Sequence, residues 1–243
     1  MAKLLVTRPE PDVFYTVARL AALDIEGVAQ PLLERATLPV SLPPANGFAA
    51  LALTSGNALR ALEERGRLGD YLSLPVFAVG ARTAALARAR GFADVRDGGG
   101  NLDRLAESLT AAGLGGPVLY PAAQAQSGDL AAALAPAGIM VVTARIYEMR
   151  PALALPQSVL TGLGDGSFAG ALFYSRRTAE TFVGLTGSLP SEARAQLGVL
   201  CLSEQVAAPL VGARFVRVGL ADHPSEAAMM ALALSFVRDQ NAA

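Results

Sequence analysis

The chain has 243 residues and a formal net charge of −1. This length allows two domains of about 100–150 residues, and the charge argues against binding to a nucleic-acid backbone, which needs a basic face. Because the chain contains one cysteine and one histidine, an internal disulfide is excluded and no metal site is expected. No apolar run approaches the roughly 20 residues that span a bilayer, and Met1-Ala2-Lys3 leads straight into an apolar segment. We therefore expect a cytoplasmic protein with no membrane partner.

Apolar runs bounded by turn residues alternate with helical patterns of about 10–15 residues along the chain. Strands are expected at Leu4–Thr7, Val28–Leu33, Ala50–Thr54, Val76–Gly80, Val118–Pro121, Val141–Tyr147, Ala169–Tyr174, Val199–Ser203 and Phe215–Val218. Helices are expected, among other places, at Pro11–Leu23, Asn57–Arg65, Arg82–Arg90, Leu102–Ala112, Gly128–Ala135, Thr178–Leu185 and Ser225–Arg238. This alternation predicts an α/β fold in which helices flank parallel sheets.

Parts of this pattern occur twice. Ser55 and Ser175, 120 positions apart, each lie in a small polar turn that follows an apolar strand and opens a helix. The segment Ser73–Ala84 resembles Gln196–Ala207 at an offset of 123. A further pair, Lys3–Leu33 and Pro117–Tyr147, aligns at an offset of 114. Since these offsets are far too long for a solenoid repeat, they predict two similar lobes.

The last of these alignments makes a prediction about one backbone angle. Gly138 ends the helix of the later copy, where a C-cap residue often needs a left-handed backbone, and its counterpart in the earlier copy is Asp24. Aspartate tolerates that conformation better than most non-glycine residues. We therefore predict a positive φ at Asp24.

Two stretches with prolines mark the expected crossings between the lobes. Residues 34–47 contain three prolines, and residues 150–166 contain two prolines and three glycines. The expected lobes are then residues 1–34 plus 152–243, which are discontinuous in sequence, and residues 40–145. The linkers between them are expected at about 35–39 and 146–151. Two consecutive lobes divided near Gly115-Gly116 are the alternative, which fits the prolines less well.

The helix starts suggest what the two lobes bind. A helix N-terminus presents free backbone N–H groups and the positive end of the helix dipole, so it can hold an anion without a basic side chain. One such turn contains Ser55, Gly56 and Asn57, and the other contains Ser175, Arg176 and Thr178. One anion-binding turn in each lobe predicts a cleft for a polyanionic small molecule.

Five short segments follow one another along the chain: Val6-Thr7-Arg8-Pro9, Leu53–Ala58, Val79–Ala84, Ile146-Tyr147-Glu148 and Phe173-Tyr174-Ser175. As an ordered set that covers nearly the whole chain, they resemble the uroporphyrinogen-III synthase family. The resemblance implies two α/β lobes joined by a two-stranded linker, with the active site in the cleft between them. It also implies that one lobe combines the N-terminal unit with the C-terminal section.

The reaction that the resemblance implies is the closure of linear hydroxymethylbilane to uroporphyrinogen III, with inversion of ring D and loss of water. This is a lyase step of tetrapyrrole and heme biosynthesis that needs neither a metal nor an organic cofactor. Tyr147 matches the family's tyrosine that is thought to help the departing hydroxyl, because a protonated phenol can donate to that oxygen. The expected partner is this linear tetrapyrrole with its eight carboxylates, and we expect a monomer.

Each candidate site residue has a structural alternative. Tyr147 is the expected catalytic residue, and packing at the lobe junction is its alternative. The expected substrate-binding residues are Arg8, Ser55, Gly56, Asn57, Gly80, Thr83, Ser175, Arg176, Thr178 and Ser203. A surface salt bridge is the alternative for Arg8, and N-capping is the alternative for the residues at the helix starts. Glu204 beside Ser203 would repel an acidic substrate, which weakens the case for that turn.

Three other functions compete with this one. The strongest is a non-catalytic bilobal small-molecule binding or sensor protein, because paired α/β lobes around a cleft also describe solute receptors. A nucleotide-dependent transferase is disfavoured because Gly98-Gly99-Gly100 lacks the context of a phosphate-binding loop. A serine hydrolase would need His223 as its base, yet neither Ser55 nor Ser175 lies in a G-x-S-x-G motif.

Overall fold

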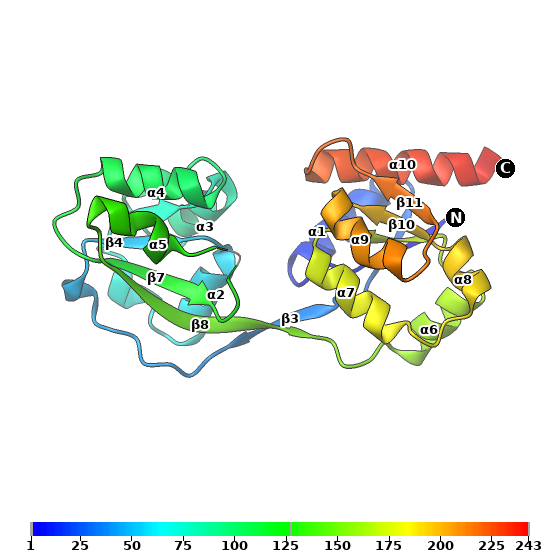
Figure 1. Ribbon diagram of the computed structural model, residues 1–243, viewed down its shortest axis with the longest axis horizontal. Helices are drawn as coiled ribbons and strands as arrows, with labels where there is room; N and C mark the ends of the chain where they lie inside the picture. Colours follow the sequence, from blue (N-terminus) through cyan, green and yellow to red (C-terminus); the bar gives the residue numbers. More distant parts are fainter. Residues whose placement is uncertain (1, 127, 243) are drawn as a thin grey trace. The chain divides into compact units, whose positions relative to one another are not determined.

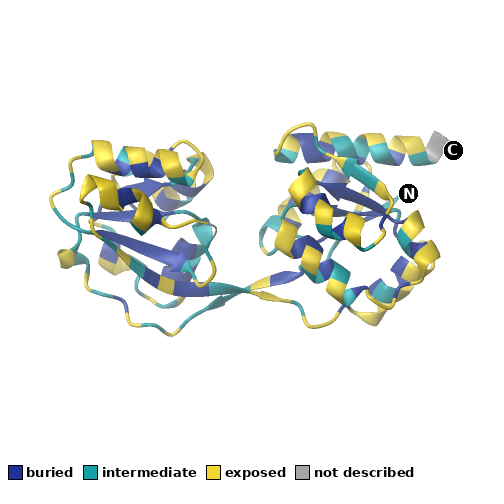
Figure 2. Cartoon of the chain, viewed as in Figure 1, coloured by how far each residue is buried: buried dark blue, intermediate teal, exposed yellow. Residues whose placement is uncertain are grey.

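The computed structural model describes residues 2–126 and 128–242. The chain divides into two compact units: unit 1 comprises Met1–Glu34 with Arg150–Ala243, and unit 2 comprises Arg35–Met149. A five-stranded sheet and a six-stranded sheet are present, with helices packed against them (Figure 1). The α/β class expected from the sequence is therefore confirmed. The buried strands and the exposed outer helix faces are seen in Figure 2.

The sheet of unit 1 is parallel and has the order β11-β10-β9-β1-β2. Its strands are β1 (Lys3–Val6), β2 (Glu26–Ala29), β9 (Gly170–Phe173), β10 (Gly198–Cys201) and β11 (Arg217–Leu220). Its helices are α1 (Asp12–Ala21), α6 (Gln157–Gly164), α7 (Arg176–Leu185), α8 (Ser191–Gln196), α9 (Glu204–Gly212) and α10 (Glu226–Ala242).

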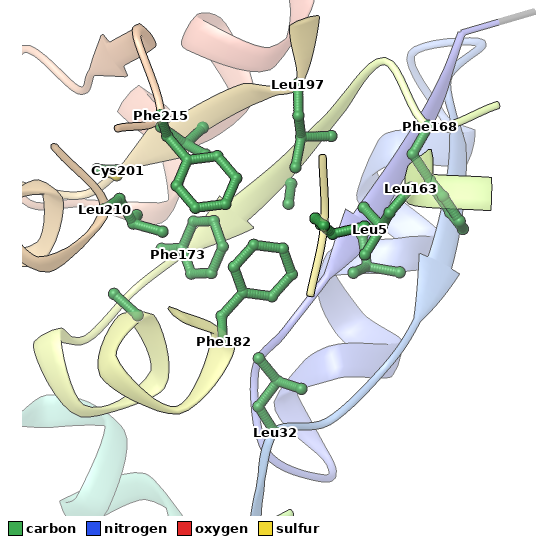
Figure 3. Close-up of a cluster of buried hydrophobic side chains, with 14 of the residues drawn as sticks. Leu5, Leu32, Leu163, Phe168, Phe173, Phe182, Leu197, Cys201, Leu210 and Phe215 are labelled. Carbon is green, nitrogen blue, oxygen red and sulfur yellow. The ribbon is translucent and has the colours of Figure 1, made fainter. Parts of the chain in front are cut away.

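Both faces of this sheet are covered, because successive strand residues point to opposite sides. Leu4 and Val6 belong to a core with α1 and α10, whereas Leu5 belongs to a core with α6, α7 and α9. In the latter core, the ring of Phe182 packs against those of Phe173 and Phe215, with centroid distances of 5.1 and 5.7 Å, and Figure 3 shows the three rings together. Burial on both faces explains why the strands read as continuous apolar runs.

The sheet of unit 2 has the order β3-β8-β7-β4-β5-β6. Its strands are β3 (Leu33–Thr37), β4 (Ala50–Leu53), β5 (Val76–Ala78), β6 (Val95–Asp97), β7 (Val118–Ala123) and β8 (Val141–Pro151). Helices α2 (Gly56–Glu64) and α3 (Ala81–Ala89) share a core on one face, and α4 (Leu102–Ala111) and α5 (Leu130–Leu134) share a core on the other. Short 3-10 turns lie at Ala45–Gly47, Leu68–Tyr71 and Ala135–Ala137.

The strand registers confirm that the two units are similar. Leu4 pairs with Gly170 in unit 1, and their counterparts at offsets of 114 and 120, Val118 and Ala50, pair in unit 2. The other paired strands keep the same correspondence: β1–β2 matches β7–β8, β9–β10 matches β4–β5, and β10–β11 matches β5–β6. The predicted backbone angle is also confirmed, since φ is 58° at Asp24 and 70° at Gly138.

Several expected elements differ from the structure. The segment Val28–Leu33 is not one strand, because β2 ends at Ala29 and β3 begins at Leu33. Pro31, which lies in the gap, cannot donate a ladder hydrogen bond. The crossing stretch 150–166 also contains helix α6, which begins directly after Pro156. Strand β6 was not predicted, since its three residues carry little apolar pattern.

The chain passes from one unit to the other along two neighbouring strands. These are β3 and the end of β8, which lie next to each other in the sheet order. The Leu38 N–H donates to the Ile146 carbonyl at 2.8 Å, and the Ala152 N–H donates to the Leu32 carbonyl at 2.9 Å. From Leu32 to Leu38 the residue number rises, while that of the bonded partner falls from Ala152 to Ile146. The two crossings therefore run antiparallel.

Candidate functional site

The order of the strands in unit 2 reverses between β7 and β4. The chain continues from β4 outward to β5 and β6, whereas from β7 it continues outward to β8 on the other side. In open α/β sheets, ligands bind beyond the carboxyl ends of the strands at such a switch point. A cavity of about 490 Å³ lies here. It is lined by Thr54, Ser55, Val79, Gly100, Asn101, Leu102, Tyr120, Ala123, Ala125, Gln126, Gly128 and Tyr147.

Hydroxyl groups gather in this cavity. The Thr54 hydroxyl and the phenol of Tyr120 share a hydrogen bond of 2.9 Å, and the Ser55 hydroxyl and the phenol of Tyr147 line the same cavity. The Ser55 oxygen also accepts the Asn57 N–H at 3.2 Å, which makes Ser55 the N-cap of α2. None of the described lining residues carries a formal charge. The cavity therefore offers neutral hydrogen-bonding groups on an apolar background.

Both tyrosines are held as neutral phenols. Tyr120 and Tyr147 are 3% and 5% exposed. Burial raises the pKa of each phenol above its ordinary value, and the hydrogen bond from the neighbouring serine or threonine only partly opposes this rise. A phenol that remains protonated at neutral pH can donate a hydrogen bond to a substrate oxygen.

An irregularity in β8 explains how Tyr147 reaches the cavity. Ala122 of β7 pairs with Arg145 of β8, but the next residue, Ala123, pairs with Tyr147, so Ile146 is an extra residue. In a regular strand, successive side chains point to opposite faces, so Tyr147 would share the exposed face of Arg145 and only Ile146 would be buried. Instead, Ile146 and Tyr147 are both buried. A β-bulge redirects the side chains that follow it, and bulges are frequent beside functional sites.

The remaining predicted residues of unit 2 lie outside the cavity lining. A Cβ atom on Gly56 would lie 2.5 Å from Cδ1 of Leu86, so close packing of α2 against α3 accounts for this glycine. The side-chain oxygen of Asn57 accepts a hydrogen bond from Arg60 at 2.8 Å. Gly80 is the N-cap of α3, and Thr83 is a buried residue of the same helix. The structure thus brings together Ser55 and Tyr147, but not the other four.

Arg8 of unit 1 is occupied by internal partners. Its guanidinium pairs with Asp12 at 2.9 Å and with Glu226 of α10, and it lies 4.1 Å from the ring centre of Tyr174. The Thr16 hydroxyl also donates to Glu226, at 3.1 Å. Two carboxylates therefore already neutralise this arginine, in agreement with its structural alternative.

The predicted helix-start residues of unit 1 act as caps or lie at helix termini. The Ser175 oxygen accepts the Thr178 N–H at 3.2 Å and lies 2.7 Å from the Thr178 hydroxyl, which caps α7. Arg176 pairs with Glu180 at 2.8 Å on the exposed side of the same helix. Ser203 is the N-cap of α9, without a side-chain capping bond. Their contact with substrate stays a prediction.

Thr54, Tyr120 and Asn101 were not among the predicted site residues. The sequence places Tyr120 and Thr54 in expected strands, and their position beside the switch point depends on the order of those strands. Asn101 caps α4 by accepting the Arg104 N–H at 2.9 Å. The sequence did contain one indication of these site residues, namely polar side chains near the ends of apolar strands. That indication points to a shared site only when β7 is known to lie next to β4.

Residues 15–231 match the model of the family described as uroporphyrinogen-III synthase HemD. The chain belongs to this family. Its activity is accordingly the cyclisation of hydroxymethylbilane in heme biosynthesis, with a tetrapyrrole as its substrate. Nothing in the comparisons supports the alternative of a non-catalytic binding protein. No curated protein sequence matches this chain.

Two solved structures of similar fold cover nearly all of the chain. One is uroporphyrinogen-III synthetase from Helicobacter pylori, with a TM-score of 0.67 and 22% identity over 97% of this chain and 99% of that one. The other is a mutant uroporphyrinogen III synthase from Thermus thermophilus, with a TM-score of 0.55 and 18% identity over 100% of both chains. At these identities the likeness concerns the fold.

Two kinds of feature are absent from the described residues. Across 2–126 and 128–242, no group of histidine, cysteine, aspartate and glutamate side chains is suited to a metal ion. Within the same ranges, no helix combines the length and the apolar character that crossing a bilayer requires.

Proposed function

We propose that this chain closes hydroxymethylbilane to uroporphyrinogen III with inversion of ring D, and that the cavity of unit 2 receives the end of the substrate that loses its hydroxyl. The observation that carries this assignment is the pair of buried phenols, Tyr120 and Tyr147, at the switch point of the sheet. The family supplies the substrate class and the cyclisation; the role of each residue is our proposal.

In the proposed reaction, Tyr147 donates a hydrogen bond to the hydroxymethyl oxygen. As the carbon–oxygen bond breaks, its electron pair leaves with the oxygen, which takes a proton from solvent and departs as water. One proton returns to solvent when ring D regains its aromaticity after ring closure. The lone pair of the pyrrole nitrogen stabilises the electron-deficient carbon, so no protein nucleophile is needed. Because burial raises the pKa of this phenol, Tyr147 stays protonated at neutral pH and is present as the hydrogen-bond donor that the step needs.

The enzyme must also control conformation, because attack has to occur at the substituted carbon of ring D. Holding the reacting atoms in the correct geometry can lower a barrier by several kcal/mol. We propose that the starts of α2, α3, α7 and α9 hold substrate carboxylates through their backbone N–H groups. We also propose that the protein acts as a monomer in the cytoplasm.

The test is a coupled assay without added cofactor. Hydroxymethylbilane is generated in situ, the purified protein is added, and the products are oxidised and separated as porphyrin isomers. An excess of isomer III supports the proposal. Isomer I alone, which unassisted closure yields, would refute it, provided that circular dichroism shows a folded protein.

A further inference from the structure

A second hollow of unit 2 adjoins the tyrosine cavity. It has a volume of about 610 Å³ and shares Gln126 and Gly128 with that cavity. Its other lining residues are Gln124, Asp129, Ala131, Thr143 and Arg145. A ligand that fills the tyrosine cavity can therefore extend a side group past Gln126 into this second hollow.

Arg145 is the one cation among the described lining residues of the two hollows. It is exposed on β8, opposite Ala122 and two residues before Tyr147. Most arginines of unit 2 contact a carboxylate or a carbonyl, as Arg35 does with Glu64 and Arg65 with Leu38. For Arg145, in contrast, the described part of the chain supplies no ion pair and no hydrogen bond. Its charge is thus available to a ligand.

We propose that Arg145, together with the side-chain amides of Gln124 and Gln126, forms a subsite for one carboxylate side chain of the tetrapyrrole. This inference rests on the proposed function, because the reacting end of the substrate is then in the tyrosine cavity. A guanidinium matches a carboxylate with two parallel N–H donors, and each amide adds N–H donors of its own. None of the described residues that line the tyrosine cavity is charged, so Arg145 supplies the charge complementarity that an acidic substrate requires there.

Asp129 lies in the same hollow and opposes this attraction. One of its carboxylate oxygens accepts the Ala132 N–H at 3.0 Å, which makes Asp129 the N-cap of α5. Its charge is therefore partly offset by the helix start, where an acidic residue is favourable. The subsite model makes predictions of opposite sign for the two residues: removing the charge of Arg145 weakens binding of an acidic ligand, and removing the charge of Asp129 strengthens it.

The experiment measures the dissociation constant of uroporphyrin III, the oxidised product, which keeps all eight carboxylates. Its absorbance is followed as purified protein is added at low ionic strength. The variants are Arg145→Gln, Arg145→Glu, Arg145→Lys and Asp129→Asn, since asparagine retains the capping oxygen. Arg19→Gln is the matched control, because Arg19 is an exposed arginine near the end of α1 in unit 1.

Because an exposed ion pair contributes modestly, we expect about threefold weaker binding for Arg145→Gln and about tenfold weaker binding for Arg145→Glu. Arg145→Lys should weaken binding less than Arg145→Gln does, because it keeps the charge but loses the paired N–H donors. Arg19→Gln should bind as the wild type does, and Asp129→Asn should bind more tightly. The difference between wild type and Arg145→Gln should shrink as salt is added. Equal affinities of Arg145→Gln and Arg19→Gln, or no binding to the wild type, would overturn the subsite.

Turnover separates this inference from the proposed function. If the wild type forms isomer III and Arg145→Gln raises KM with little change in kcat, the subsite contributes binding alone. If the wild type forms only isomer I, the proposed function fails, whereas the titration still decides whether Arg145 holds a carboxylate.

Discussion

The hydroxyl oxygen of Thr54 lies 2.9 Å from the phenol oxygen of Tyr120, and this contact joins the end of β4 to β7 across the switch point. A hydrogen bond of this kind contributes about 1 kcal/mol to stability. We expect a double-mutant cycle of Thr54→Val and Tyr120→Phe to give a coupling energy of about 1 kcal/mol in urea unfolding. A coupling near zero would mean that the two hydroxyls do not bond in solution.

Tyr147→Phe should lower kcat at least about tenfold, which corresponds to roughly 1.4 kcal/mol of barrier. The substitution removes the hydroxyl and keeps the buried ring. Tyr15→Phe is the matched control, because Tyr15 is 63% exposed on α1. Formation of isomer III by Tyr147→Phe at the wild-type rate would remove this phenol from the mechanism.

The pH profile offers an independent check on Tyr147. Since burial raises the pKa of its phenol, this residue stays a hydrogen-bond donor up to at least about pH 10, the ordinary value for tyrosine. Its contribution to stability is fully present below about pH 10 and is lost as the pH rises through the higher folded-state pKa. We therefore expect the pH profiles of kcat for the wild type and for Tyr147→Phe to have the same shape near neutral pH. A fall in kcat there that is present in the wild type and absent from Tyr147→Phe would show that the phenol titrates in this range.

Gly198→Ala should destabilise unit 1 by about 1–3 kcal/mol, because overpacking forces neighbouring groups to move. An added Cβ would lie 2.1 Å from the ring of Phe236 on α10. The control is Gly184→Ala in helix α7, where no atom lies within 4 Å of the added carbon and alanine should stabilise by up to about 1 kcal/mol. Urea unfolding measures both changes, and equal stabilities would contradict the packing of α10 on β10.

Asp24→Ala should cost about 1 kcal/mol, whereas Asp24→Gly should be neutral or stabilising. The φ of 58° at Asp24 is left-handed, a conformation that glycine adopts freely and that aspartate tolerates better than alanine because its short polar side chain can hydrogen-bond locally. Gly138→Ala, at the equivalent position with a φ of 70°, should cost at least as much as Asp24→Ala, because it adds a Cβ atom to a left-handed residue. Thermal unfolding of the three variants provides the comparison, and a stabilising Asp24→Ala would argue against the left-handed backbone.

Cys201 should resist thiol reagents in the folded protein. It is fully buried in β10, and burial raises the pKa of its thiol to about 12, so the reactive thiolate is scarce at pH 8. We expect modification by a disulfide reagent at pH 8 only when urea unfolds unit 1. Rapid reaction of the native protein would show that β10 becomes accessible.

Much of the fold followed from local pattern. The apolar run Ala50–Leu53, the capping serines Ser55 and Ser175 and the left-handed Asp24 are specified by neighbours in sequence, through burial on both sheet faces, helix capping and backbone sterics. The offsets between similar segments predicted the duplication, since equivalent strands must keep their spacing to pair in the same register. The break between β2 and β3 was missed because it depends on one proline, Pro31, within an otherwise apolar run. Strand β6 was missed because its three residues carry little apolar pattern.

Local patterns were therefore enough to predict the elements, their repetition and two of the residues that meet at the candidate site, Ser55 and Tyr147. Three features emerge only in the folded chain: Tyr120 and Thr54 share the cavity, Ile146 forms the bulge before Tyr147, and Arg145 lies beside the same site. The physical reason is that helix and strand signals act over a few residues, whereas strand order, register and cavity lining arise when segments distant in sequence pack together.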